Sequence, residues 1–507
     1  MNYPIWYRPG MSGGLLIALI AIIHVFISHF AVGGGLYLVL AEHKGLREHS
    51  PGILAFTRAH ARFFLLMTLV AGAVTGVAIW FVISLVQPAA TSLLIHVFVF
   101  GWATEWVFFL VEIVAISIYY YQFDRMDRRS HLAIGWIYFG AAWLSLFLIN
   151  GIIDFMLDPG GWVATGSFWS GFFNPLFWPS LAFRTGTAAL LAGVYAFLTA
   201  AFLADPDTRR VMARYTGRWV LFAYAGSLAA GVWYFLRLPV QARALVAGGS
   251  PTIHRALQAG FWALIGLALL ALVLTWVRPA RVSRPAALLV MASALVFMGA
   301  FEWVREAARR PYVINGVMYS NGVLQADQAR LDQDGYLASA RWAGVHSVDP
   351  GDPLAAGREL FIQQCYPCHT LHGFGNDLAT RTRTMGYPAM LAYLKTIHEK
   401  RYFMPPFIGR EDEARALAAF IVKGIHGKDL PVEAGPGDPG RALFETNCTA
   451  CHDEALVRAR ITGWSRARLR TALDRLSALD PGMTDFAGTP ADKDMLADYL
   501  VPAGGGR

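Results

Sequence analysis

The distribution of apolar residues along the chain predicts a membrane protein. Eight apolar stretches fill the first 310 residues, near positions 12–41, 63–86, 92–121, 132–157, 179–203, 219–240, 256–277 and 285–309. Each is long enough to cross a bilayer, which takes about 20 residues. A bundle of buried soluble helices is the alternative, and eight such stretches in succession argue against it. We therefore predict an all-α fold whose first part is a bundle of about eight membrane-spanning helices in the lipid bilayer.

Basic residues predict how this bundle is oriented. Most Lys and Arg residues of the bundle fall in the loops after the first, third, fifth and seventh stretches, at 44–62, 125–129, 209–218 and 278–284. The opposite side carries only Arg8, Arg237, Arg243 and Arg255. Because basic loops stay in the cytoplasm, the N-terminus and the region after the last span are both predicted outside. The first stretch has no small-residue cleavage site, so we expect a retained helix.

After the last span the pattern changes to short amphipathic segments. Residues 1–310 are predicted as the membrane domain and the polar residues 311–351 as a linker. Two small helical domains follow, 352–430 and 436–507, and each begins with a Cys-x-x-Cys-His motif. These are Cys365-Tyr-Pro-Cys368-His369 and Cys448-Thr-Ala-Cys451-His452. In this motif both thiols bond covalently to haem and the histidine binds its iron, so two covalent c-type haems are predicted.

Zinc is the alternative for these cysteines, because it also binds Cys pairs and histidine. A zinc site would need both pairs at one ion, whereas here each pair has its own histidine and the motifs lie about 80 residues apart. The motifs use all four cysteines of the chain, so no disulfide is expected.

A methionine after each motif is predicted to complete the iron site. Met404 precedes Pro405-Pro406, and Met483 lies in the second domain. His/Met ligation raises the haem potential. His372 and His398 are alternatives to Met404, whereas no histidine follows His452.

Helices flank both motifs. Gly357 and Phe361 precede the first motif, and Gly440 and Phe444 precede the second. An amphipathic segment closes each domain. Both domains therefore resemble the class I cytochrome c family over nearly their whole lengths.

Ionisable residues inside the predicted spans indicate function, because burying them in a bilayer is costly. His24 and His29 share the first span but point about 140° apart, so they cannot share one haem face. Glu105 and Glu112 in the third span are seven residues apart and lie on one face. His24, Glu105 and Glu306 fall in the outer half, and Glu112 lies about 10 Å deeper. A structural polar network is the alternative.

Local motifs in the spans resemble subunit I of the cytochrome bd oxidases from about residue 15 to 320. Ile23-His24-Val25-Phe26 is similar to the family's haem-ligand helix, and Gly72-Ala-Val-Thr75-Gly76 to its Gly-x-x-Thr-Gly segment. Glu112 followed by Asp124-Arg125 fits the proton-path glutamate, and Glu105 falls one residue from the family's other glutamate. Glu306-x-x-Arg309-x-Pro311-Tyr312 resembles the Glu-x-x-Arg-Gln-Pro-Trp motif, whose glutamate binds a high-spin haem.

The resemblance implies two further haems that are not covalently bound. Both would be of b type, with d type an alternative for one, and His24, Glu306 and Arg309 would hold them. It also implies that Glu105 and Glu112 act in catalysis, with Glu112 delivering protons, and that a second membrane subunit is a partner. No nucleic acid is needed to explain the net charge of +8, which comes mostly from the cytoplasmic loops.

The departures from the family concern its quinol-oxidising part. Arg184 stands where the low-spin haem has a histidine, and Leu257 stands where it has a methionine. His254 is a possible substitute ligand. The quinol-binding loop is reduced to about residues 240–253.

These features predict a terminal oxidase of the bacterial cytoplasmic (inner) membrane, with both c domains on the periplasmic side. Electrons would pass from a soluble or membrane-attached cytochrome c, or another periplasmic donor, through the c haems to the haem pair, where dioxygen is reduced. Nitric oxide is an alternative oxidant. A quinol dehydrogenase that exports electrons through its c haems, or an electron-transfer subunit of a larger respiratory complex, remains open.

Overall fold

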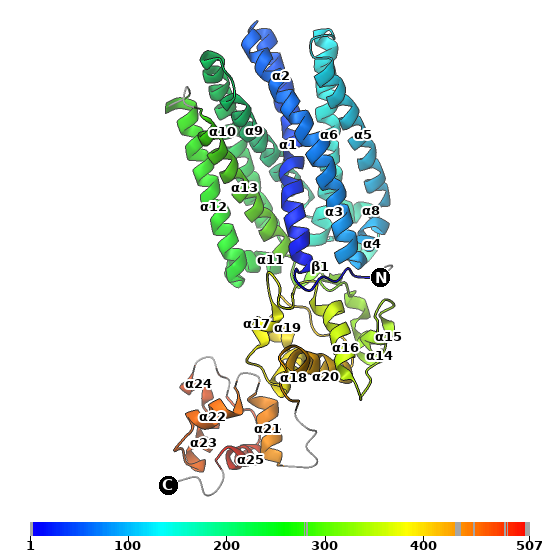
Figure 1. Cartoon of the computed structure of the whole chain (residues 1–507), viewed down its shortest axis with the longest axis vertical. Helices are drawn as coiled ribbons and strands as arrows, with labels where there is room; N and C mark the ends of the chain where they lie inside the picture. The colour runs from blue at the N-terminus through cyan, green and yellow to red at the C-terminus, as the bar shows by residue number, and fades with distance from the viewer. Residues whose placement is uncertain are drawn as a thin grey trace. The chain divides into compact units, whose positions relative to one another are not determined.

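The apolar stretches form long helices in the structure, a computed structural model that describes residues 4–277, 279, 282–430, 438–449, 452–480, 483 and 485–501. The chain divides into two compact units. One unit holds the membrane helices and covers Gly14–Gly322. The other joins the N-terminal residues up to Gly13 to the region Val323–Arg507. Figure 1 shows the long helices of the first unit and the short helices of the second.

Within the described residues, eight helical spans are long and apolar enough to cross a membrane, which confirms the predicted all-α membrane bundle. They are α1 (Gly13–Arg47), α2 (Pro51–Leu65) continued by η1 (Leu66–Gly72) and α3 (Ala73–Val86), α5 (Val99–Tyr121), α6 (Arg128–Leu157), α9 (Phe177–Ala201), α10 (Pro206–Arg237), α12 (Pro251–Leu272) continued by η3 (Val273–Val277), and α13 (Arg284–Ala307). Shorter helices lie in the connections, namely α4 (Pro88–Val97), α7 (Trp162–Thr165), α8 (Phe168–Phe172), α11 (Val240–Ala244) and η2 (Leu245–Gly249).

Several helices begin before the apolar stretch that predicted them, because polar residues cap their first turns. Ser50 accepts a hydrogen bond from Ile53 N ahead of α2, and Asp127 accepts one from Ser130 N ahead of α6. Asp205 and Ser283 cap α10 and α13 in the same way. Such caps satisfy amide groups that the helix cannot. Hydrophobicity alone therefore located the spans but not the polar turns that extend them.

Helix α9 lies at the centre of the membrane unit. Its most apolar window is 72% buried, against 6–33% for the other spans. Helix α1 approaches α9 closely, since a Cβ added at Gly33 would clash with the carbonyl of Ala188. Most side chains of α9, Arg184 among them, are therefore enclosed by protein and not by lipid.

The chain folds back on the membrane unit after α13. Strands β1 (Tyr312–Ile314) and β2 (Met318–Tyr319) form an antiparallel hairpin, with the rings of Tyr312 and Tyr319 stacked at 5.0 Å. Asn315 N donates to the Met156 carbonyl at the end of α6, at 2.9 Å. The hairpin thus ties the end of the last span to its neighbours.

The second unit contains small helices and a helix crossing at the start of each cytochrome c region. Its elements are η5 (Gln325–Asp327), α14 (Gln328–Asp334), α15 (Tyr336–Ser339), α16 (Pro353–Leu360), η6 (Phe361–Cys365), α17 (Leu378–Thr382), α18 (Tyr387–Lys395), α19 (Ile397–Lys400), α20 (Glu411–Ala419), η7 (Phe420–Ile425), α21 (Pro439–Asn447), α22 (Glu454–Arg460), α23 (Arg466–Leu473), α24 (Leu476–Leu479) and α25 (Pro490–Leu500).

Glycine permits the same crossing in both regions. A Cβ at Gly357 on α16 would clash with the carbonyl of Ala416 on α20. A Cβ at Gly440 on α21 would clash in the same way with the carbonyl of Met495 on α25. The two regions therefore repeat one plan, in which the helix before the haem motif crosses the closing helix with backbones in contact.

Gly357→Ala should destabilise the first of these regions, because the added methyl group must push α16 away from α20. Overpacking of this kind costs about 1–3 kcal/mol. Thermal unfolding of the full-length protein, followed by the Soret absorbance of covalent haem, should show a lower melting temperature. Gly386→Ala is the matched control, since nothing lies within 4 Å of a Cβ at that position. Equal melting of the two variants would contradict the crossing.

Candidate functional site

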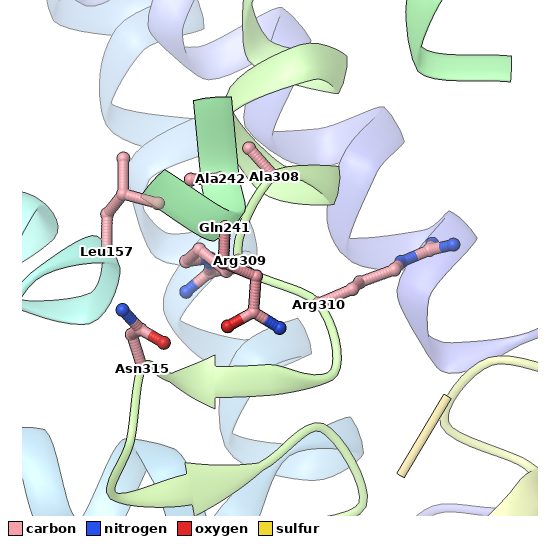
Figure 2. A pocket seen from close by; sticks show the side chains of 7 residues that line it. All are labelled: Leu157, Gln241, Ala242, Ala308, Arg309, Arg310 and Asn315. Atoms are coloured by element: carbon pink, nitrogen blue, oxygen red, sulfur yellow. The ribbon is translucent and has the colours of Figure 1, made fainter. Parts of the chain in front are cut away.

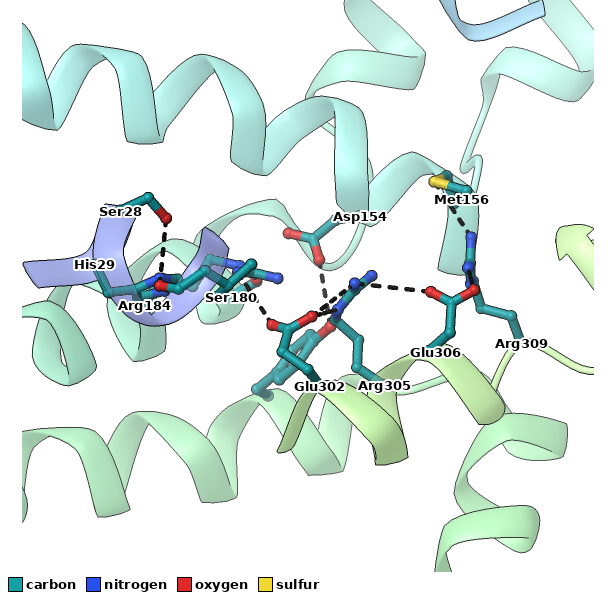
Figure 3. Close-up of polar contacts among 12 residues, drawn as sticks. Ser28, His29, Asp154, Met156, Ser180, Arg184, Glu302, Arg305, Glu306 and Arg309 are labelled. Atoms are coloured by element: carbon teal, nitrogen blue, oxygen red, sulfur yellow. Dashed lines mark hydrogen bonds and ion pairs between the residues drawn. The ribbon is translucent and has the colours of Figure 1, made fainter. Parts of the chain in front are cut away.

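A chain of buried charges links helices α9 and α13 in the membrane unit (Figure 3). Arg184 Nη1 lies 3.8 Å from Glu302 Oε1, and both side chains are almost fully buried. Glu302 accepts hydrogen bonds from Arg305 at 2.8 and 3.0 Å. Arg305 also lies 3.8 Å from Glu306, whose carboxylate pairs with Arg309. Because an isolated charge is costly in a bilayer, the alternation of acids and bases allows five charged groups to lie there together.

The side chain of Arg184 also contacts a residue of its own helix and an aromatic ring on α13. Its Nε donates to Ser180 Oγ at 3.3 Å, and its guanidinium lies 5.8 Å from the centre of the Phe301 ring. A guanidinium carries only donors and has no lone pair to give to iron. Arg184 therefore carries an ion-paired charge and cannot itself bind iron.

The other two positions considered for the low-spin haem lie outside this charge chain. Leu257 on α12 is 39% exposed. His254, in the preceding turn, lies with its Nε2 3.0 Å from Gln258 Nε2 on the same helix. Neither residue supplies a second ligand opposite Arg184.

Glu306 and Arg309 lie at the C-terminal end of α13. Arg309 is 4% exposed and donates to the Val313 carbonyl at 2.8 Å and to Met156 Sδ at 3.2 Å. The Arg309 guanidinium is therefore held in place, whereas the side chain of Glu306 is 41% exposed. A small pocket beside Arg309 is lined by Leu157, Gln241, Ala242, Ala308, Arg309, Arg310 and Asn315 (Figure 2). The carboxylate of Glu306 is accessible and is held by Arg309, which is compatible with a role as a haem ligand.

His24 on α1 has the hydrogen bonding of a metal-binding histidine. Its Nδ1 lies 3.1 Å from Thr75 Oγ1. Thr75 gives its one hydroxyl proton to the Ala71 carbonyl at 2.7 Å, so its oxygen accepts from His24 Nδ1–H. Nε2 then keeps its lone pair, and this is the tautomer that binds iron. The described residues around His24 therefore fit a haem.

His29 was assigned no role from the sequence, yet it lies beside the charge chain. Its Nδ1 donates to the Val25 carbonyl at 2.9 Å. Figure 3 shows the imidazole next to Arg184. Its Nε2 is buried and has no hydrogen-bond partner among the described residues. The two histidines of α1 thus face different neighbours, with His24 against α3 and His29 against α9.

Glu105 and Glu112 lie on one face of α5, at different distances from polar partners. Glu112 accepts a hydrogen bond from Ser145 on α6 at 2.7 Å. No hydrogen bond or ion pair in the described part of the chain involves Glu105, and none joins His24 to Glu306. Glu112 is therefore the better anchored of the two carboxylates.

A second buried polar group, missed from the sequence, lies further along α5. Tyr119, seven residues after Glu112, donates to Glu42 at 2.7 Å. His131 Nδ1 lies 2.7 Å from the other oxygen of Glu42, and His131 Nε2 donates to the Tyr119 carbonyl at 2.8 Å. The signal was the seven-residue spacing of polar residues on α5, which places Glu105, Glu112 and Tyr119 on one face.

The first Cys-x-x-Cys-His motif ends helix η6 and turns into a loop. Cys365 and Cys368 are both part-buried and unpaired. His369 Nδ1 lies 3.1 Å from the Asn376 carbonyl, and Asn376 also donates to the Cys368 carbonyl at 2.8 Å. Since a carbonyl can only accept, His369 carries its proton on Nδ1, which leaves the Nε2 lone pair for a metal. The motif therefore fits covalent haem.

Met404 lies on a loop that His398 supports. The His398 imidazole donates from Nδ1 to the Met404 carbonyl at 2.6 Å, and Met404 N donates to the Arg401 carbonyl at 2.7 Å. His372 is exposed, in a left-handed conformation with φ of 53°. His398 therefore supports the backbone of the Met404 loop, while its Nε2 keeps its lone pair.

The second motif is described only in part. Cys448 ends α21, and His452 N donates to the Cys448 carbonyl at 3.1 Å, while Cys451 lies outside the described residues. Met483 is half-buried, and its N donates to the Asp480 carbonyl at 2.9 Å.

Burial raises the pKa of the Cys365 thiol to about 12, with a smaller contribution from Cys368, and raises that of Cys448 to about 11. No group of three or more His, Cys, Asp or Glu side chains among the described residues is placed to hold a metal ion.

Comparisons with known proteins match the membrane part and the C-terminal part of the chain to two different families. Residues 15–235 match the family described as cytochrome bd terminal oxidase subunit I. Residues 352–421 and 435–500 each match the family described as cytochrome c oxidase, cbb3-type, subunit III. No curated protein matches the chain in sequence.

Among solved structures, the bd oxidase from Geobacillus thermodenitrificans is similar to this chain, with a TM-score of 0.54 and 19% identity over 61% of this chain and 90% of that one. An identity this low supports the shared fold alone. The matched domains imply c-type and b-type haem and make the protein a membrane-integral haem oxidoreductase of the respiratory chain. The chain therefore joins a membrane region that matches the cytochrome bd oxidase subunit I family to two regions that match the cbb3-type subunit III family.

Proposed function

We propose that this protein is a terminal oxidase that draws electrons from a cytochrome c and not from quinol. The observation that carries this proposal is the buried Arg184–Glu302 ion pair. By the sequence resemblance, Arg184 stands at a ligand position of the family's low-spin haem, through which quinol electrons would pass. The two c domains supply another route to the same oxygen-reducing site.

The proposed reaction consumes four electrons and four protons for each dioxygen and gives two waters. When bound, the c haems would carry the electrons one at a time and a b-type haem pair, or one b and one d haem, would reduce dioxygen. His24 Nε2 and the Glu306 carboxylate are the proposed iron ligands, and Arg309 holds Glu306 in place. Glu112, held by Ser145, is the proposed donor of protons from the cytoplasmic side, and Glu105 the next carboxylate along the same helix face.

We further propose that the N-terminus and both c domains lie on the periplasmic side of the inner membrane. The distribution of basic loops supports this orientation. A contact within the second unit supports it independently: Phe374 N, just after the first haem motif, donates to the Gly10 carbonyl at 2.9 Å. Residues 4–13 and the first c domain must then lie on one side of the membrane. A soluble or membrane-attached cytochrome c is the proposed donor, and a second membrane subunit the proposed partner.

Purified protein should consume dioxygen faster with reduced soluble cytochrome c, or with an artificial donor, than with quinol. The reason is that Arg184 and Leu257 replace the ligands through which quinol electrons would leave. An oxygen electrode with each donor measures this directly. Rapid reduction of the c haems by quinol, without dioxygen consumption, would contradict the proposal and establish a quinol dehydrogenase. Reduction of the c haems by both donors without any dioxygen uptake would favour an electron-transfer subunit.

Glu306→Ala should abolish dioxygen uptake and leave both c haems reducible, because it removes a proposed ligand from the membrane site only. Glu48→Ala is the matched control, since this acid lies in the loop after α1 and pairs with Lys44. Oxygen uptake and reduced-minus-oxidised spectra of both variants are the measurements. Normal uptake in Glu306→Ala would exclude Glu306 as a ligand.

Met404→His should lower the potential of one c haem and leave the other unchanged. Imidazole stabilises the ferric state relative to a thioether, so exchanging the ligand lowers the potential. Met385→His is the matched control, because it adds a histidine to the same domain at a position that is not a proposed iron ligand. A redox titration in which Met404→His follows the wild type would show that Met404 does not bind the iron.

A further inference from the structure

The N-terminal segment before α1 is built into the first cytochrome c domain. Residues 4–13, here called the strap, belong to the same compact unit as that domain. Its backbone pairs with the loop that follows the first haem motif. Phe374 N donates to the Gly10 carbonyl at 2.9 Å, and Leu371 N donates to the Pro9 carbonyl at 3.2 Å. A parallel bridge between Met11 and Phe374 continues this pairing.

The strap also holds a residue of the motif itself. Tyr366, between the two cysteines, is fully buried. Its hydroxyl donates to the Trp6 carbonyl at 3.1 Å and accepts from Arg8 N at 3.1 Å. The strap thus satisfies both hydrogen-bonding functions of a buried phenol, which would otherwise be left unpaired at a cost of about 1–3 kcal/mol.

Aromatic packing covers the rest of this contact. The Tyr7 ring meets the Tyr366 ring edge to face at 4.9 Å, and it lies 6.5 Å from the Phe361 ring. The Arg358 guanidinium lies 5.8 Å from the centre of the Tyr7 ring. The strap packs closely against the loop at Gly373, because a Cβ at this position would lie 2.6 Å from Gly10 backbone atoms.

The second domain has a different residue at the corresponding position. Thr449 follows Cys448 where Tyr366 follows Cys365. Its hydroxyl donates to the Glu445 carbonyl of its own helix at 2.6 Å. The tyrosine and the strap that holds it are therefore features of the first domain.

We propose that the strap is part of the first c-haem site and raises the potential of that haem by excluding water from its attachment motif. Ferric haem carries one more positive charge than ferrous haem. Burial disfavours the more charged state, because water solvates a charge better than protein does. The strap covers Tyr366 and the loop after His369, so its removal exposes the motif. This proposal rests on haem attachment at Cys365 and Cys368, and it holds whatever oxidant the membrane domain uses.

Two variants of the full-length protein remove the strap contact from opposite sides. Tyr7→Ala deletes the ring that packs on Tyr366, and Gly373→Val pushes Gly10 away without altering the strap or the motif. Tyr7→Phe keeps the edge-to-face ring and should behave as wild type. Gly386→Val is the control for the added bulk, since this glycine lies in the same domain with φ of −89° and ψ of 173° and no atoms near its Cβ.

Spectroelectrochemical titration of the two c haems decides the matter. In Tyr7→Ala and Gly373→Val, the ferrous-to-ferric ratio of one c haem should fall about tenfold at a fixed potential, which is about 59 mV for one electron. The haem of the second domain serves as an internal reference and should not move. Unchanged potentials, even with a lower melting temperature, would show that the strap is only a mechanical tie and would overturn the proposal.

Haem-stained denaturing gels separate this result from a failure of the haem assignment. If Cys448→Ser protein keeps its stain, the first domain carries covalent haem and an unshifted potential counts against the strap alone. If the stain is lost, the first domain carries no covalent haem, and both the assignment and the strap proposal fall.

Discussion

The interior of the membrane domain depends on the ion pair between Arg184 and Glu302. Arg184 lies on α9, the most enclosed span, where an unpaired guanidinium could not remain. Glu302 compensates it from α13 and is in turn balanced by Arg305, which leads to Glu306 and Arg309. Removing one partner of such a pair leaves a buried charge alone and costs about 3–5 kcal/mol. The position of Glu306 is therefore tied to Arg184 through a series of ion pairs.

The charge on Arg184 bears on how the membrane domain and the two c domains would function together. Arg184, which the sequence resemblance places at a low-spin haem ligand position of the bd oxidase family, carries a positive charge that cannot bind iron. In the proposed function, electrons for the membrane site therefore come from the two c domains of the same chain. The chain passes between the two units twice. It does so once after the hairpin that follows α13, and once at the strap, because residues 4–13 belong to the C-terminal unit and continue directly into α1, which carries His24.

The sequence predicted the parts of this molecule whose signals are local. Apolar runs located the eight spans, and the two Cys-x-x-Cys-His motifs located the c domains, because both patterns lie within short windows. The partners that determine the role of a residue come from distant segments of the chain. The type of a residue and its sequence neighbours do not reveal these partners. Arg184 was recognised as a departure, but its pairing with Glu302 joins positions 118 residues apart in the printed sequence. The same holds for Glu42 with His131, and for Tyr366 with the strap, since nothing in residues 4–13 marks them as part of a haem domain.

The central claim is that electrons flow from the c haems to an oxygen-reducing site in the membrane domain. The most direct test is to mix the fully reduced protein with dioxygen in a stopped-flow spectrometer and to follow the haem bands separately. The account predicts that the membrane haem is oxidised first and that both c haems follow, in the absence of any added acceptor. C haems that stay reduced in the presence of dioxygen would contradict it.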